Sequence, residues 1–96
     1  MSPLKRKKLS KIRFELDKLD NSLIKLIKKR TNLVKKVIQI KERKSQIVDH
    51  KRIKTILSNI RKKSLRNNID PRITNRIWRN MIFAYIDYEK RNFKKK

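Results

Sequence analysis

Two cations that share one side of a predicted helix are the first sign of chemistry in this sequence. Arg30 and Lys41 stand eleven residues apart, and eleven steps of about 100° return almost to the starting angle of an α-helix. Both side chains are therefore expected to point the same way, about three turns apart. Arginine can bind a carboxylate through two parallel hydrogen bonds, whereas lysine offers a point charge. The pair suits a small anion with two acidic ends.

Arg30 also interrupts an apolar stripe. Apolar residues recur in steps of three and four from Leu9 onward, and the step after Leu26 falls on Arg30. A guanidinium there is costly unless an anion meets it, or unless the side chain extends to the edge and keeps its charge in water. The pattern leaves both interpretations open. The stripe consists of Leu9, Ile12, Leu16, Leu19, Leu23, Leu26, Leu33, Val37 and Ile40.

Three other charged residues are further candidates for a site. Arg13 lies seventeen residues before Arg30, on a different face and about 25 Å away along the helix axis. It is either a surface residue or a contributor to the site of a partner chain in an antiparallel or crossed dimer. Asp49 and Arg52 stand three apart at the start of a predicted helix. Their plain interpretation is a surface ion pair of little energetic value.

Tyr85 and Glu89 stand four apart and share a face of the last predicted helix. Apolar residues lie along the same face. Glu89 is therefore either a buried acid that holds its proton or a solvated glutamate paired with a nearby lysine or arginine.

The composition excludes several kinds of site. There is no Gly, which argues against Gly-rich phosphate loops and tight hairpins. There is no Cys, which excludes disulfides, zinc fingers and thiol nucleophiles. His50 is the single histidine, and the few acids show no ligand spacing. We expect neither a metal nor a cofactor.

Three helices and no strand are predicted to position these residues. The stripe, uninterrupted by proline, predicts a first helix much longer than the others. Asp49 is expected to cap the second helix, and Asp70 followed by Pro71 is expected to start the third. The predicted bounds are about 8–43, 50–65 and 71–92, with a loop at 43–48 and a turn at Asn67–Asn68.

The chain is expected to form one all-α domain over residues 1–96 and to pair with a second copy. A small domain cannot cover so long a stripe by itself, so the first helix needs a partner, most simply the same helix of another chain. The basic ends, residues 1–8 and 94–96, are expected to fray. No apolar run resembles a signal peptide or a membrane span, which favours a cytoplasmic protein.

The formal charge of +23 has two explanations. Polycations bind nucleic acids by releasing counterions from the phosphate backbone. Alternatively, a coding bias toward Lys and Ile leaves a solvated basic surface, which can help to capture an anionic substrate. No recognition motif is present and few aromatic residues are placed for base stacking, which argues against a nucleic-acid binder. A third interpretation, a purely structural coiled coil, would not explain why Arg30 lies on the apolar stripe.

Taken together, these features resemble the all-α chorismate mutase family. The stretch Ile12–Asp20 resembles the opening of that family, and Leu23–Lys41 carries Arg30 and Lys41 at its internal spacing. Asp49-His50-Lys51-Arg52 matches the start of its second helix, and Glu89 stands where it has Gln or Glu. The resemblance covers residues 9–93, nearly the whole chain.

The resemblance implies an intertwined homodimer with two equivalent sites. Arg30 and the partner's Arg13 are then expected to hold the two carboxylates of chorismate. Lys41 and a protonated Glu89 are expected to donate hydrogen bonds to the ether oxygen as its bond to the ring breaks. The rearrangement to prephenate, a step of aromatic amino-acid biosynthesis, is unimolecular. Holding the folded substrate and stabilising the developing charge therefore suffice.

The resemblance also gives Asp49 and Arg52 the task of shaping the site. Ile53 stands where mutases commonly have Glu, and Tyr85 where many have a small polar residue. Both differences resemble the isochorismate pyruvate-lyase branch of the fold, whereas Asp49 and Glu89 match the mutases. We favour chorismate mutase. The alternative is a lyase that eliminates pyruvate from isochorismate and leaves salicylate.

Overall fold

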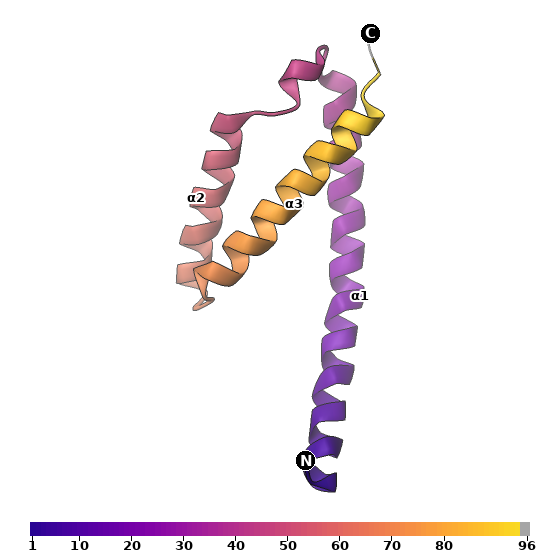
Figure 1. The fold of residues 1–96 in the computed structure, drawn as a ribbon, viewed down its shortest axis with the longest axis vertical. Coiled ribbons are helices and arrows are strands. Elements are labelled where there is room, and N and C mark those ends of the chain that lie inside the picture. Colours follow the sequence, from indigo (N-terminus) through magenta and orange to yellow (C-terminus); the bar gives the residue numbers. More distant parts are fainter. Residues whose placement is uncertain (95–96) are drawn as a thin grey trace. The chain divides into compact units, whose positions relative to one another are not determined.

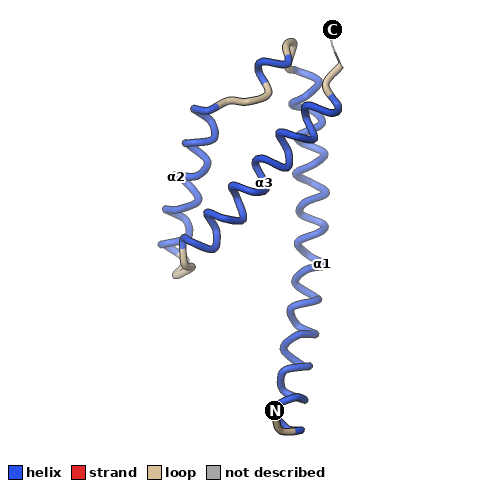
Figure 2. The backbone as a smooth tube through the Cα atoms, in the orientation of Figure 1, coloured by secondary structure: helices blue, strands red, loops and turns tan. Residues whose placement is uncertain are grey.

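The computed structural model describes residues 1–94 and contains, over that range, three α-helices, one short 3-10 helix and no strand (Figures 1 and 2). The prediction of an all-α fold with a long first helix is confirmed. The chain divides into two compact units, Met1–Leu33 and the remainder from Val34 onward. The elements are α1 (Pro3–Ile40), η1 (Lys44–Gln46), α2 (His50–Arg66) and α3 (Pro71–Asn92).

The N-terminal end of α1 differs from the prediction. The helix begins at Pro3 rather than near residue 8. Ser2 provides the cap, because its Oγ accepts a hydrogen bond from the Lys5 N–H at 3.2 Å and its carbonyl accepts one from the Arg6 N–H at 2.9 Å. Proline suits the first helical position because it has no N–H to satisfy there. The Ser–Pro pair therefore extends the helix into the basic segment that was expected to fray.

The apolar stripe of the first unit is open to solvent. α1 contains no buried residue, and Leu16, Leu19 and Leu23 keep 52%, 61% and 53% of their surface exposed. Helices in proteins gain most of their stability from packing an apolar face rather than from helix propensity. The first unit therefore has a long apolar face that its own residues do not bury.

α2 and α3 form an antiparallel hairpin within the second unit (Figure 1). The Asp49 carboxylate caps α2 by accepting the Arg52 N–H at 3.0 Å, and the Asp70 carboxylate caps α3 at the Arg72 N–H, 2.9 Å away. Both predicted caps are confirmed. The turn between the helices places Asn68 at φ 56°, a left-handed conformation that Asn tolerates better than most residues.

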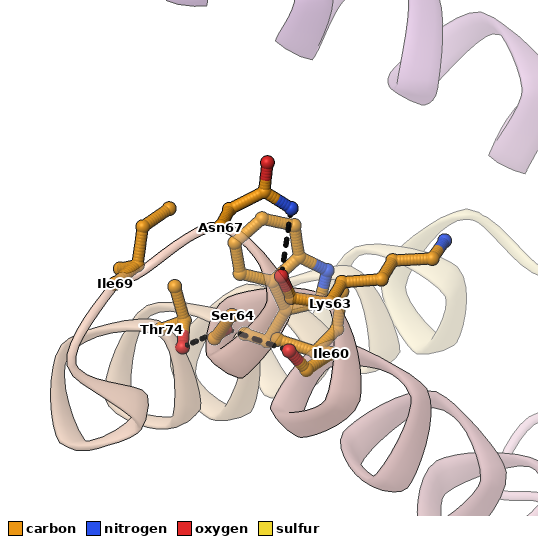
Figure 3. Close-up of a pocket in the computed structure, with 7 residues that line it drawn as sticks. Ile60, Lys63, Ser64, Asn67, Ile69 and Thr74 are labelled. Carbon is orange, nitrogen blue, oxygen red and sulfur yellow. Dashed lines mark hydrogen bonds between the residues drawn. The ribbon is translucent and has the colours of Figure 1, made fainter.

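The core of the second unit is small and partly polar. Ser64 and Thr74 are buried and share a 2.6 Å hydrogen bond between α2 and α3, beside a pocket that also contains Trp78 (Figure 3). Ile47 and Ile86 are the buried hydrophobic residues within residues 1–94. So small a core gives one chain little stability. Lys94 follows α3, and the remaining two residues of the end expected to fray lie outside the described part of the chain.

Candidate functional site

The site begins where α1 ends. The Lys41 N–H still bonds the Val37 carbonyl at 3.1 Å. Beyond it, the next two backbone N–H groups, of Glu42 and Arg43, turn instead to Oε1 of Gln46, at 2.8 Å and 2.9 Å. One side-chain oxygen thus closes the end of the helix. Because Gln46 captures these donors, α1 stops short of the predicted end near residue 43.

This closure positions the ammonium group of Lys41. Ile47 follows Gln46, is 3% exposed, and accepts a hydrogen bond from Lys41 Nζ through its carbonyl at 3.4 Å. Lys41 Nζ also lies 3.1 Å from Oε1 of Glu89, on α3. An ammonium carries three donors, and these are its two acceptors within residues 1–94. The third N–H remains available to a ligand oxygen.

Glu89 is buried and ion-paired at once. Its side chain is 9% exposed, and that of Lys41 is 21% exposed. The two alternatives raised from sequence, a buried acid and a glutamate paired with a cation, are therefore both partly correct. No fully buried polar side-chain atom in the described chain lacks a partner, so Oε2 of Glu89, which has no hydrogen bond there, keeps contact with solvent. Both partners of this pair therefore keep some contact with solvent.

The remaining predicted residues of the second unit lie on α2 and α3. Tyr85 is half-buried one helical turn before Glu89, on the same side of α3. Ile53 is half-buried in the first turn of α2. The predicted ion pair between Asp49 and Arg52 is wrong, because the carboxylate binds the backbone N–H of Arg52 rather than its guanidinium. The unsatisfied backbone N–H groups at the start of α2 compete with the guanidinium for the Asp49 carboxylate.

Arg13 and Arg30 belong to the first unit, on α1, and both are exposed. Neither has an ion pair with another described residue. The structure therefore brings Lys41 and Glu89 together directly and leaves the two arginines open to solvent. Their part in a site stays a prediction.

Gln46 and Ile47 are residues of this site that the sequence analysis missed. Segment 43–48 lacks an amphipathic pattern, so the sequence predicts only a loop there. The available signal was the apolar pair Ile47-Val48 directly before the Asp49 cap, since two apolar residues in a loop often anchor it to a core.

Two kinds of site are absent from the described residues. No group of three or more His, Cys, Asp or Glu there is arranged to hold a metal ion. Over the same part of the chain, the helices are too short or too polar to span a membrane.

The geometry is that of a small all-α chain in which a buried glutamate is paired with a lysine from another helix end. The comparisons specify the class. Residues 12–90 match the family described as chorismate mutase type II, and the chain belongs to this family. It is 38% identical over 76 residues to a chorismate mutase of Methanocaldococcus jannaschii, covering 78% of this chain and 77% of that one. No solved structure matches the chain. The resemblance seen in the sequence is thereby confirmed.

Proposed function

We propose that this protein is a chorismate mutase that rearranges chorismate to prephenate in aromatic amino-acid biosynthesis. The observation that carries the proposal is the pairing of Lys41 with Glu89 at 3.1 Å in a chain of the chorismate mutase type II family. In the sequence these residues are separated by all of α2 and most of α3, yet their side chains meet.

The chemistry needs two hydrogen bonds rather than a covalent step. As the ether bond of chorismate breaks, negative charge grows on its oxygen, and preorganised donors lower the energy of that state. The free N–H of Lys41 supplies one donor. Glu89 supplies the other through the O–H of its protonated carboxyl. The proposed step calls for neither a cofactor nor a metal, because positioning and two hydrogen bonds suffice.

The two carboxylates of the substrate require cations from elsewhere. We assign one to Arg30 and the other to Arg13 of the partner subunit, since these two residues of one chain lie about 25 Å apart along α1. A homodimer is supported by the exposed stripe of α1, exemplified by Leu19 at 61% exposure. It is also supported by the small core of the single chain. In this arrangement each site is incomplete without the second copy.

Four further residues assigned to the site affect the choice between chorismate and isochorismate as substrate. Asp49 and Arg52 order the start of α2, while Ile53 and Tyr85 contribute apolar and aromatic surface. Ile53 and Tyr85 are also the residues that resemble isochorismate pyruvate lyases. A cytoplasmic location stays a prediction.

The decisive experiment offers the purified protein chorismate and isochorismate separately and identifies the products. We expect prephenate from chorismate. Salicylate and pyruvate from isochorismate, without prephenate from chorismate, would replace the mutase by the lyase alternative. If neither substrate is consumed, the enzymatic proposal is wrong.

A further inference from the structure

The hairpin of α2 and α3 carries far more positive charge than a dicarboxylate substrate requires. Residues 51–79 contain ten Lys and Arg but one acid, Asp70, and all ten cations are exposed. The ten are Lys51, Arg52, Lys54, Arg61, Lys62, Lys63, Arg66, Arg72, Arg76 and Arg79.

A shallow groove runs between the two helices on one side of this hairpin. Ser58 and Arg61 line it from α2, Asn75 lines it from α3, and Leu57 and Pro71 complete its apolar part. A guanidinium, a hydroxyl and an amide can all donate hydrogen bonds to phosphate oxygens. We call this face of the hairpin the groove side.

Helical register places further cations on the groove side. Lys54 stands seven residues, about two turns, before Arg61 on α2. On α3, Arg72 stands three residues before Asn75 and Arg79 four residues after it, so all three share one side. The groove is therefore bordered by cations on both helices.

Most of these cations have no counter-charge. Arg72 pairs with Asp70 at 2.8 Å, whereas Lys54, Arg61 and Arg79 have no ion pair with any residue of the described chain. Three unpaired cations spread over two helices fit a ligand with repeated negative charges better than a single small anion.

The apolar surface of α3 distinguishes a nucleic acid from a membrane. Ile73 and Ile77 are about half exposed, at 56% and 52%, but each is two residues from Asn75 and so lies about 200° away from the groove side. Phe83, 54% exposed, stands four residues after Arg79 and adds one aromatic ring next to the cations. One ring among cations is suited to stacking on a base, not to insertion into lipid.

We propose that the groove side of the α2–α3 hairpin binds the phosphodiester backbone of a nucleic acid. Arg61, Ser58 and Asn75 hold one phosphate in the groove, and Lys54 and Arg79 contact its neighbours along the strand. This binding reads backbone charge rather than base sequence, so it needs no recognition motif. It is separate from the mutase reaction and uses none of the residues assigned to it.

The test removes charge from the groove side and, in equal amount, from another face. The groove variant combines Lys54→Gln, Arg61→Gln and Arg79→Gln. The matched control combines Lys63→Gln, Arg66→Gln and Arg91→Gln, which are exposed and stand well over 100° around their helices from Arg61 on α2 and from Asn75 on α3. Fluorescence anisotropy measures binding of labelled single-stranded RNA, single-stranded DNA and duplex DNA, each about 20 units long, over a range of salt concentrations. Circular dichroism verifies that each variant folds.

We expect the groove variant to bind about tenfold or more weakly near physiological salt, and the slope of log K against log salt to decrease by about 0.7 per lost contact on a single strand. The control should lose at most about twofold, because it changes only the long-range field. A preference among the three probes shows whether the bound nucleic acid is single-stranded RNA, single-stranded DNA or duplex DNA.

If both variants lost the same amount of affinity, binding would depend on the overall positive charge rather than on the groove side, and the proposal would be overturned. Wild-type protein that binds none of the probes near physiological salt would overturn it as well. So would binding to phosphatidylserine vesicles that exceeds binding to every nucleic-acid probe.

Discussion

The two units of this chain differ in how much of their apolar surface they bury. In the second unit, α2 and α3 pack together and bury Ser64 and Thr74 between them, and Ile86 is buried as well. In the first unit, one helix exposes leucines such as Leu19 over more than half of their surface. A helix of this composition is stable when another apolar surface covers it. The comparison indicates that the second unit buries a core of its own, whereas the first presents the apolar face on which the proposed dimer depends.

The proposed site divides along the same line. The residues assigned to the breaking ether bond, Lys41 and Glu89, belong to the second unit and are already paired at 3.1 Å. The residues assigned to the carboxylates, Arg13 and Arg30, belong to the first unit and are exposed. Substrate binding should therefore depend on dimerisation, whereas the donor geometry should not. The following variants test this division.

The largest effect is expected from Arg30→Ala. A bidentate contact between arginine and carboxylate is lost, and because that contact orients the reacting conformer, we expect kcat/KM to fall by about a thousandfold or more. Initial rates of prephenate formation measure this. Lys29→Ala, which removes a neighbouring exposed cation about 100° around the helix, should stay near the wild-type rate. If Arg30→Ala keeps its rate while remaining a folded dimer, the assignment of the carboxylate site is wrong.

The next effect tests whether the first unit needs a second chain. Leu23→Asn places a polar group in the middle of the stripe, where Leu23 is 53% exposed in the single chain. If both copies bury this residue in a dimer, about 3 kcal/mol or more is lost, which weakens dimerisation by roughly a hundredfold. Sedimentation equilibrium measures the change. Lys25→Gln, two residues away and on the opposite side, is the control. Unchanged association would mean that the stripe is not the interface.

A smaller, pH-dependent effect is expected from Glu89→Gln. If Glu89 donates a hydrogen bond to the ether oxygen, it can do so only as the protonated carboxyl, whereas the amide of Gln donates an N–H at every pH. The variant should therefore have a flatter pH profile and exceed the wild type by about tenfold at the alkaline end. Profiles of kcat against pH for both proteins measure this. Parallel profiles would remove Glu89 from the role of donor.

The sequence predicts the elements of this fold better than the contact between them. Helical periodicity and the caps Asp49 and Asp70 locate three helices, because these signals are local. The meeting of Lys41 with Glu89 depends on how α3 returns toward the end of α1, which no local pattern encodes. Only the resemblance to a family placed both residues in one site. The closure by Gln46 was missed because a single side chain overrides the helical pattern there.

Gln46 offers a test of positioning within the second unit alone. Gln46→Ala removes the acceptor for two backbone N–H groups, so the segment that presents the Ile47 carbonyl to Lys41 loosens. We expect kcat to fall by about tenfold with little change in KM.

The matching controls distinguish positioning from general destabilisation. Gln46→Glu keeps an oxygen acceptor and should restore most of the rate. Gln39→Ala, at an exposed position of α1, should have no effect. If Gln46→Glu is as slow as Gln46→Ala, the two hydrogen bonds do not position Lys41.

The smallest effect concerns the start of α3. The side chain of Arg72 lowers the pKa of the Asp70 carboxyl below its ordinary value of 3.8, with a second contribution from the Arg72 backbone N–H. A lowered pKa in the folded state means that this contribution to stability is present above pH 3.8 and is lost as the pH falls through the folded value. Asp70→Asn should therefore be slightly less stable than wild type near neutral pH, and the difference should shrink in acid.

Thermal unfolding at several pH values measures this difference, with Asp87→Asn, an exposed acid outside any ion pair of the described chain, as the control. The same experiment at several protein concentrations separates the two units. A change confined to the self-organised hairpin should shift the unfolding temperature equally at every concentration, whereas Leu23→Asn should shift it most in dilute solution, where fewer dimers form. If both variants showed the same concentration dependence, the two units would not differ in their need for a partner.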